Sequence, residues 1–420
     1  MVIFKTMKRA KSILGLAVLV IFLTTIVDII MFSSNYIPIL NRLETSLFDW
    51  DIQDLVYSSD KFKDSKTRCD EIVLVNWGHI DRDSIALLLE SIKKYSPGVI
   101  GIDAIFFDLK DSVKDNKLKQ SLTGCDLVTP IDLRAWSEEK GSFLKAERTN
   151  DYFSTSRTSR AFTSFYSYDV MRDAYGTDDE SFIRTFSPYE KLNDTAVFCF
   201  GYELVKRYDG ALFENYLRKH KVTQNEVVRY WGDTSLFKTI GYKDILNEKI
   251  ERSTLAGKIV ILTFLGYSRG DWRNSEGKFT TPLNPRIVGR NKPDMYGGAI
   301  HANIALSVLK GVRVRSVSWL TQILTNFSFV FLFMLTLDTI RSKRSEKLPL
   351  YGRLTAYTFI VFLMGLGILL YFEFEIKIDF RLAVVYILAL PEVYLIYINR
   401  VIPYFKEIME KIRVRFRSKQ

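Results

Sequence analysis

The sequence predicts an α/β domain with a mostly parallel sheet flanked by helices, held by four transmembrane α-helices, one N-terminal and three C-terminal. Two observations lead to this fold class. Long stretches almost without charge lie near both ends of the 420-residue chain, although 25% of all residues are charged. Between them, short β-branched runs alternate with segments of helical periodicity, which is the pattern of βα units.

The apolar stretches are each long enough to cross a bilayer. Residues 12–32 contain only Asp28 as a charged residue, and 21 helical residues span a hydrocarbon core of about 30 Å. No clear small-residue cleavage pattern follows, so we expect an uncleaved anchor rather than a signal peptide. The three C-terminal candidates are 317–338, 354–372 and 382–399.

Charge determines the expected orientation. Residues 1–11, 339–353 and 400–420 together contain sixteen Lys and Arg against three Glu, which places them in the cytoplasm by the positive-inside rule. The domain 33–316 and the loop 373–381 are then extracytoplasmic. The formal net charge of +11 is therefore a sign of topology and of contact with anionic lipid, and we expect no nucleic-acid binding.

The outer domain shows alternating strand and helix patterns. The clearest are strands at 71–76, 98–103 and 257–265 and helices at 83–95 and 298–309. Weaker patterns predict strands at 126–131 and 196–200 and a helix at 202–208. Residues 137–189 are polar and poorly periodic, so we interpret them as an insertion. The first two strands with the helix between them form a βαβ unit, which implies parallel strands.

Several motifs, in this order, are similar to one known family. They are Leu43-Glu44 with Phe48-Asp49, then Asp81 through KKYSPGVIGIDAIF with Asp103, then GKIVIL, Asp271, Thr281-Pro282 and YGGAIHANIALSVLKG with His301 and Asn303. Together they resemble the second type of CHASE domain, a sensory extracellular domain associated with cyclases and histidine kinases. The resemblance covers roughly residues 40 to 316.

The resemblance implies a non-enzymatic sensor or assembly subunit of the bacterial plasma (inner) membrane. Members of that family commonly continue into a cytoplasmic output domain, whereas this chain ends about 20 residues after Asn399. We therefore expect it to act through an unknown membrane or periplasmic partner protein, with a homo-oligomer as a further possibility. No cofactor is expected, and no HExxH, CxxC or close His pair predicts a metal site.

Candidate ligand-binding residues lie after predicted strands. Asp103 and Asp271 follow the carboxyl ends of parallel strands, where open α/β sheets bind ligands. We expect them to share a pocket with Thr281 and His301, next to Asn303. The alternative is a buried polar latch made of the same residues. For His301 the latch interpretation is favoured: a neutral imidazole bonded to a strand-end carbonyl or to an aspartate such as Asp103.

A serine hydrolase is the second hypothesis. Residues 266–270 read G-x-S-x-G after a strand, and Ser268, Asp294 and His301 follow in the order of α/β-hydrolases. A nucleophile elbow needs a helix directly after the serine, however, and here a loop rich in turn formers follows. The three cysteines, Cys69, Cys125 and Cys199, are expected to be buried as small hydrophobic residues.

A third hypothesis is transport or proton relay around Glu392. This carboxyl follows Pro391 near the middle of the last predicted span, where charge is costly and usually faces the helix bundle. The simpler interpretation is a protonated Glu392 that bonds across helices. The tail 400–420 has apolar residues at helical spacing among basic ones and is expected to adsorb to anionic lipid or to dock a partner helix.

Overall fold

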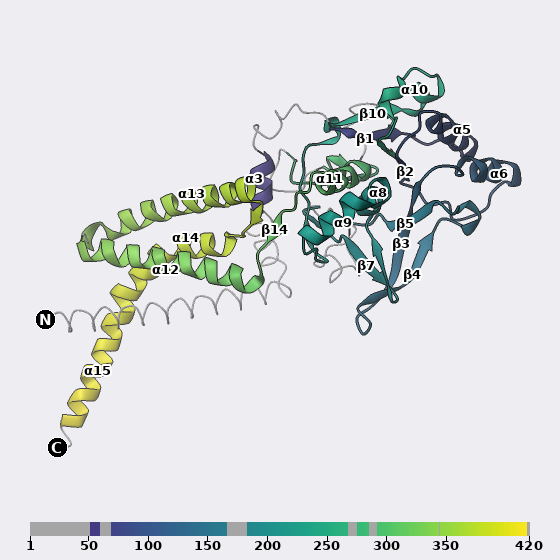
Figure 1. The fold of residues 1–420 in the computed structure, drawn as a ribbon. Coiled ribbons are helices and arrows are strands. Elements are labelled where there is room, and N and C mark those ends of the chain that lie inside the picture. Colours follow the sequence, from purple (N-terminus) through teal and green to yellow (C-terminus); the bar gives the residue numbers. More distant parts are fainter. Residues whose placement is uncertain are drawn as a thin grey trace. The chain divides into compact units, whose positions relative to one another are not determined.

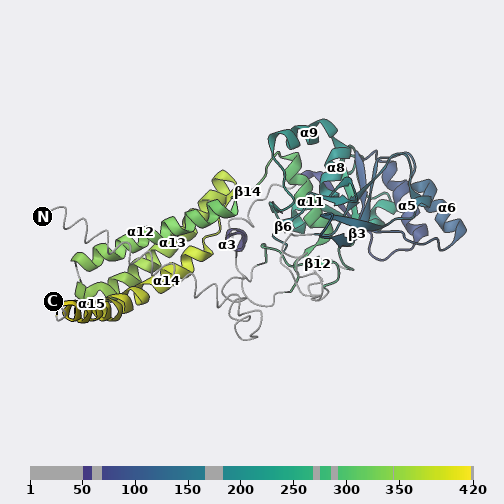
Figure 2. The same cartoon turned by 90° about the horizontal axis from the view of Figure 1, so that it is seen from below.

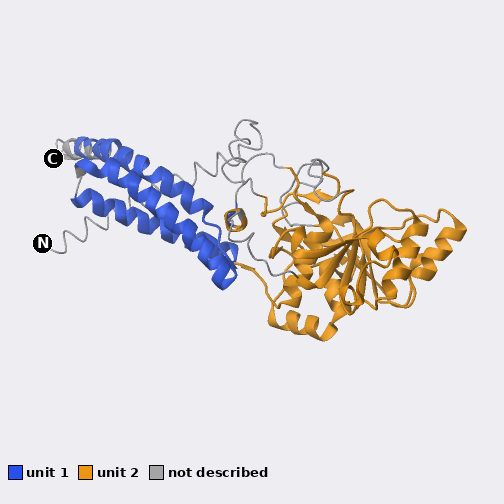
Figure 3. Ribbon diagram, turned by 90° about the horizontal axis from the view of Figure 1, so that it is seen from above, with its two compact units in different colours: residues 1–52, 317–420 blue, residues 53–316 orange. Residues whose placement is uncertain are grey.

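The computed structural model describes residues 51–58, 69–165, 183–267, 275–284, 292–343 and 345–417. The chain divides into two compact units (Figure 3). The sheet unit is Gln53–Ser316, and the helical unit comprises Met1–Ile52 and Val317–Gln420. The predicted N-terminal span lies outside the described residues.

A nine-stranded sheet forms the centre of the sheet unit within the described residues (Figure 1). Its strand order is β10-β1-β11-β2-β3-β4-β7-β8, with β5 also paired to β3. All pairings from β10 to β3 are parallel, whereas β3 with β4 and β7 with β8 are antiparallel, so the sheet is mostly parallel, as predicted. The strands are β1 (Cys69–Asn76), β2 (Val99–Ile102), β3 (Leu127–Ser137), β4 (Ser142–Arg148), β5 (Thr158–Phe162), β7 (Tyr189–Leu192), β8 (Thr195–Phe198), β10 (Phe237–Gly241) and β11 (Ile259–Thr263).

The strand β11 lies between β1 and β2, although it comes more than 150 residues after them in the chain. All five of its residues are buried, as expected for a central parallel strand with both faces covered. The predicted β1-helix-β2 unit is therefore present with its strands parallel, but the two strands are not neighbours. Local periodicity identified the three strands and gave no information on the placement of β11 between β1 and β2.

Helices cover both faces of the sheet (Figure 2). On one face lie α5 (Arg82–Lys93), α6 (Ser112–Ser121) and α10 (Tyr242–Leu246), and on the other α8 (Phe200–Tyr208), α9 (Gly210–Lys219) and α11 (Gly297–Leu309). Because side chains alternate along a strand, Ile100 and Ile102 of β2 pack in the core beneath α5. Between them, Gly101 faces α8 so closely that an added Cβ would lie 2.8 Å from Phe200.

The interpretation of residues 137–189 as an insertion is wrong for its described parts. β4 and β5 belong to the main sheet. Both pair with β3, β5 in parallel and β4 antiparallel. Their buried residues are consecutive, at 142–143 in β4 and 161–162 in β5, so neither strand shows the alternation expected of a strand with one face in solvent. Residues 166–182 lie outside the described part of the chain.

Short elements complete the two units. They are α3 (Ile52–Ser58), β6 (Thr185–Phe186), β9 (Glu226–Val227), β12 (Lys278–Phe279), β13 (Met295–Tyr296), β14 (Arg315–Ser316) and β15 (Ile376–Lys377). β6 pairs with β9 and β12 with β13, both antiparallel. These pairs are small sheets separate from the main one.

The helical unit contains three helices that are long and apolar enough to cross a membrane, counted over the described residues. They begin as α12 (Trp319–Lys343), α13 (Leu348–Phe374) and α14 (Arg381–Ile396), in agreement with the three predicted C-terminal spans. α14 continues through a π-helical turn, η5 (Tyr397–Val401), into α15 (Ile402–Arg417). The predicted loop 339–353 is largely helical, because both flanking helices extend beyond their apolar stretches.

The Asn326 side chain of α12 forms hydrogen bonds with backbone groups at the start of α14. The Asn326 carbonyl accepts a hydrogen bond from the Ala383 N–H at 2.9 Å, and its amide donates to the Asp379 carbonyl at 2.8 Å. The first backbone N–H groups of a helix lack intrahelical partners, so Asn326 caps α14 from a neighbouring helix. In the same unit, the Asp51 carboxylate pairs with Lys377 at 2.7 Å.

Candidate functional site

The N-terminal end of α11 lies directly against the end of β11. A Cβ added to Gly298 would fall 2.4 Å from the Thr263 side chain, so only glycine allows this approach. Thr263 is the last residue of β11, at the carboxyl edge of the parallel strands. The first turn of α11 is thus fixed at the edge where open α/β sheets bind ligands.

Asp103 follows β2 at this same edge. The Thr263 hydroxyl donates a hydrogen bond to Asp103 Oδ2 at 2.8 Å, and the Asp103 N–H donates to the Leu262 carbonyl at 2.9 Å. Burial raises the pKa of the Asp103 carboxyl, and the bond from Thr263 only partly opposes this effect. The side chain is therefore a poorly solvated acid held by one neutral donor.

His301 is buried in an aromatic surrounding, with only 3% of its surface exposed. Its ring stacks on Phe165 with centroids 4.6 Å apart and meets the Phe200 ring edge to face at 5.2 Å. The imidazole is hydrogen-bonded to the backbone of Thr163, which directly follows β5. Among the described residues, Nδ1 has no hydrogen-bond partner.

The charge state of His301 follows from this burial. Desolvation lowers the pKa of His301 to about 3, and the bond to the Thr163 backbone opposes the shift only in part. The ring is therefore neutral at physiological pH, as predicted. His301 bonds to the backbone just after β5, whereas Asp103 accepts its hydrogen bond from Thr263 rather than from His301.

Thr281 and Asp294 form a second polar pair beside α11. The Thr281 N–H and hydroxyl donate to the two oxygens of Asp294, at 2.8 and 2.6 Å. The Asn284 amide donates to Asp294 Oδ1 at 3.4 Å. Burial is the largest effect on this carboxyl and raises the pKa of Asp294 to about 6 despite these donors.

Aromatic contacts join this pair to the surroundings of His301. The Asp294 N–H donates to the Phe279 carbonyl, and the Phe279 ring meets Phe165 at 5.1 Å. Phe165 in turn stacks on His301. The polar pairs therefore lie around one helix end, separated by aromatic side chains.

Asn303 acts as a latch. Its carbonyl accepts hydrogen bonds from the N–H groups of Trp231 and Gly232, at 2.7 and 3.4 Å, and its amide donates to the carbonyls of Gly232 and Ala299 at 3.1 and 2.9 Å. All of its hydrogen-bonding capacity is used inside the protein. The contacts of Asn303 are with Trp231, Gly232 and Ala299, and its assignment as a ligand-binding residue stays a prediction.

The structure gives each of the other described candidates its own partner. Asp103 bonds to Thr263, Thr281 to Asp294, and His301 to the Thr163 backbone. Asp271 lies outside the described residues. Thr263 and the aromatic residues Phe165 and Phe200 were not predicted from the sequence. The position of Thr263 at the end of a strong strand pattern was a usable signal, whereas no pattern marked the aromatic residues.

The hydrolase residues do not form a connected set where the structure describes them. Asp294 accepts hydrogen bonds from Thr281 and Asn284, and no described bond joins it to His301. A catalytic triad needs that acid-to-histidine bond to orient the imidazole. Ser268 lies outside the described residues.

The cysteines are buried and free of disulfides, as expected for small hydrophobic residues. Burial raises the pKa of the Cys69 thiol to about 11 and that of the Cys199 thiol to about 12. Such thiols stay protonated and unreactive. In the described ranges, no group of three or more His, Cys, Asp or Glu side chains is placed to hold a metal ion.

Glu392 of α14 bonds across helices, although as an ion pair rather than as a protonated acid. Its carboxylate is about half exposed and pairs with Arg353 of α13 at 2.6 Å. Arg353 is only five residues from the start of α13, so the pair lies about 8 Å along the axis from that helix end. Pro391 is buried inside α14, and a Cβ added at Gly352 of α13 would lie 3.5 Å from its side chain. The sequence could not show that α13 begins early enough to bring Arg353 opposite Glu392.

Fold and site together define a class of protein. A mostly parallel α/β domain with polar groups at its carboxyl edge is joined to helices that can cross a membrane, as in membrane-anchored binding domains. A comparison with protein families matches the CHASE2 domain over residues 17–338. The chain therefore belongs to the CHASE2 family, whose domain is extracellular and sensory. Comparisons with curated proteins and with solved structures gave no match.

Proposed function

We propose that this chain is a sensor subunit of the bacterial inner membrane that binds a ligand outside the cell at the N-terminal end of α11 and acts through a separate partner protein. Both termini are cytoplasmic in this proposal. The CHASE2 match over 17–338 is the observation that carries it. The three apolar helices and the basic cytoplasmic segments support the membrane topology.

The chemistry around α11 favours a small, uncharged polar ligand. His301 is neutral, presents Nδ1 without a partner among the described residues, and is walled by Phe165 and Phe200. Burial raises the pKa of Asp103, so its ionised form is disfavoured. Apolar walls with a few convergent polar groups are typical of small-molecule sites.

Photo-crosslinking in intact cells tests the location of the site. Tyr267 is 62% exposed and its ring lies 5.4 Å from that of Phe264, which also meets Tyr296 at the start of α11. We expect benzoylphenylalanine at position 267 of the full chain to capture an envelope component. Capture should fall when His301 is also replaced by Phe.

The matched control is the same crosslinker at Leu87. This residue is 61% exposed on α5, which covers the opposite face of the sheet. Equal capture at 87 and 267, or capture that ignores His301→Phe, would contradict a ligand site at α11.

The proposed partner contact lies on α15. Tyr404 and Met409 are each 63% exposed on this helix, whose sequence also contains several basic residues. Affinity purification of the full chain in mild detergent should recover a partner that Met409→Glu loses and Glu407→Gln retains. A Met409→Glu variant that keeps its partner but no longer binds anionic vesicles would instead assign α15 to lipid adsorption.

A further inference from the structure

A small antiparallel sheet is hydrogen-bonded to α11 and to the two parts of the sheet unit that lead to the helical unit. We name it the coupling ribbon and define it as residues 184–186 and 226–232, which contain β6 and β9. Thr185 pairs with Val227 and Phe186 with Glu226. The Val228 N–H also donates to the Arg184 carbonyl at 3.0 Å, so residues 184–186 are hydrogen-bonded to 226–228.

The incoming segment, α3, is held by the ribbon. Arg184 binds Asp54 of α3 with two hydrogen bonds, from Nε at 3.1 Å and from Nη2 at 2.7 Å, and Asp54 is buried. One turn later, the Tyr57 hydroxyl accepts a hydrogen bond from the Tyr230 N–H at 3.1 Å. Asp51, directly before α3, is the residue paired with Lys377 in the helical unit.

The outgoing segment, residues 311–316, is held in the same way. Arg313 donates from Nε and Nη2 to the two oxygens of Glu226, at 2.6 and 2.7 Å. Glu226 is buried and also accepts from the Thr223 N–H and hydroxyl. The next residues of the chain, from Val317 on, belong to the helical unit.

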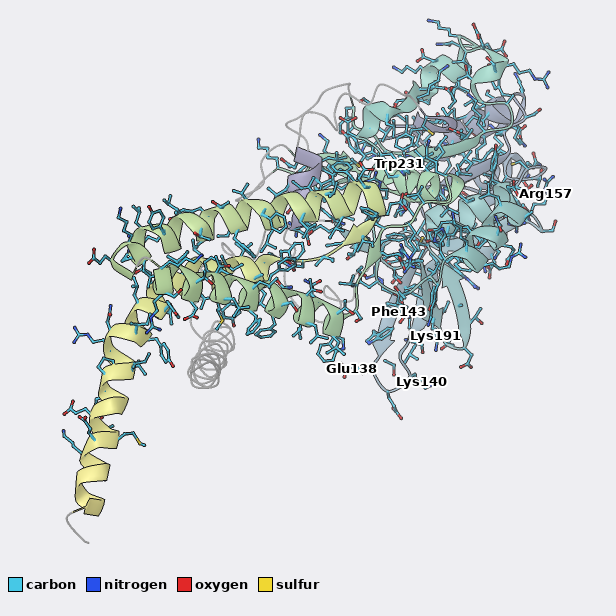
Figure 4. All side chains as sticks on the ribbon, turned by 60° about the vertical axis from the view of Figure 1, so that its left-hand side comes forward. Glu138, Lys140, Phe143, Arg157, Lys191 and Trp231 are labelled. Atoms are coloured by element: carbon cyan, nitrogen blue, oxygen red, sulfur yellow. The ribbon has the colours of Figure 1, made fainter. Side chains whose placement is uncertain are left out.

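The helix of the candidate site contacts the ribbon as well. Asn303 of α11 binds both N–H groups at 231 and 232, and the Trp231 indole N–H donates to Ser307 at 3.1 Å. Trp231 is labelled in Figure 4. His301 lies two residues before Asn303 on the same helix.

Packing at this junction leaves little space for independent movement. The cavity bordered by Tyr202, Glu226 and Arg313 measures about 10 Å³, room for one water molecule. Buried bidentate ion pairs break only at a large cost in free energy, because an unpaired charge would remain in the interior. Elements joined in this manner move together rather than one at a time.

We infer that the coupling ribbon transmits movement of α11 to both segments that lead to the membrane helices, α3 and residues 311–316. The signalling meaning of this inference rests on the proposed sensor function, whereas the mechanical coupling is testable without any ligand. Coupling of this kind is reciprocal, so changes at α3 must also reach α11.

Hydrogen exchange of the full chain in lipid nanodiscs tests the coupling. Trp231→Phe removes the indole N–H that donates to Ser307 of α11 and keeps a smaller aromatic ring at this position. Loss of a single bond should speed amide exchange about three- to tenfold in α3 and in 311–316, neither of which contacts position 231 through its indole. Arg184→Gln, at the other end of the ribbon, should speed exchange within α11 by a similar factor.

The matched control is Arg82→Gln, which breaks a buried ion pair with Asp115 between α5 and α6, on the opposite face of the sheet. It should affect exchange around those two helices alone. Exchange that rises only within the ribbon after Trp231→Phe, and not in α3 or 311–316, would overturn the inference. Asn303→Ser removes more of the hydrogen bonds between α11 and the ribbon and is the second variant. If it fails to fold, the exchange rates of Trp231→Phe test the inference. Failure here leaves the crosslinking result at 267 unaffected, so the two proposals can fail separately.

Discussion

The helices α5 and α11 cover opposite faces of one sheet and differ in almost every respect. α5 is amphipathic, with one buried face, and Asp81 caps its start by accepting a hydrogen bond from the Ser84 N–H at 2.9 Å. α11 is buried on all sides from Gly298 to Val308 and has no side-chain cap. α5 can be explained by its own sequence, whereas α11 depends on what surrounds it.

This difference shows where function is concentrated. A helix that is apolar or small all round must be enclosed, and polar residues inside it need partners from other elements. His301, Asn303 and Ser307 obtain those partners from separate segments of the chain. We therefore expect substitutions in and around α11 to have large and pH-dependent effects, and substitutions on α5 small ones.

The largest effect is expected for Gly298→Val. Even a Cβ at this position would lie 2.4 Å from Thr263, so the helix must move away from the sheet, at a cost of about 3 kcal/mol in the free energy of unfolding. Urea unfolding of the full chain in detergent measures the change. Gly210→Ala, at the start of α9 with open space around it, is the control and should not destabilise. Equal losses in both variants would remove the special role of α11 packing.

Asp294→Asn should increase stability at neutral pH. Burial raises the pKa of Asp294 to about 6, above the unfolded value near 4. The folded protein therefore holds the proton of this carboxyl more tightly than the unfolded chain does, and the stability gained from the protonated form is lost as pH rises from about 4 to 6. The uncharged variant avoids that loss and should gain up to about 3 kcal/mol at pH 7, with no gain below pH 4.

Asp81 before α5 provides the comparison for Asp294. The Ser84 N–H lowers the pKa of Asp81 to about 2, so the stability from this carboxylate is lost as pH falls through the range from about 4 to 2. Asp81→Asn should therefore reduce stability at pH 7, opposite in sign to Asp294→Asn. Unfolding curves at pH 4 and 7 separate the two, and a pH-independent gain for Asp294→Asn would contradict the assignment.

His301→Phe should make the protein less sensitive to acid. Burial lowers the pKa of His301 to about 3, so below pH 6.5 the unfolded chain takes up a proton that the folded protein excludes. Because of His301, the free energy of unfolding of the wild type should fall by about 2 kcal/mol between pH 7 and 5. The Phe variant should not show this decrease. Thermal unfolding at the two pH values checks this, and parallel pH profiles would show that His301 is solvated.

The smallest effect is expected for Leu87→Gln on α5. This side chain is exposed and contributes little packing, so the free energy of unfolding should change by no more than about 0.5 kcal/mol. A loss comparable with that of Gly298→Val would mean that the exposed face of α5 is covered by another protein or copy, and size-exclusion chromatography would reveal it.

Much of this molecule was predictable because local pattern decides local structure. The strands at 71–76 and 257–265, the helices at 83–95 and 298–309, and the three C-terminal apolar helices formed where expected. The strands β4 and β5 were missed because their buried residues are consecutive, at 142–143 and 161–162, and do not alternate with exposed ones. Contacts between residues far apart in the sequence, such as Arg353 with Glu392, cannot be predicted from helical or strand periodicity.

The sequence alone determined the α/β character of the outer domain, the membrane helices, the neutral state expected for His301 and the CHASE2 resemblance. Tertiary structure decided that β11 enters between β1 and β2, that Thr263 rather than His301 bonds Asp103, and that Asn303 holds the ribbon. The reason is physical. Periodicity follows from backbone geometry over a few residues, whereas hydrogen-bond partners are chosen by packing among segments that meet only in the folded chain.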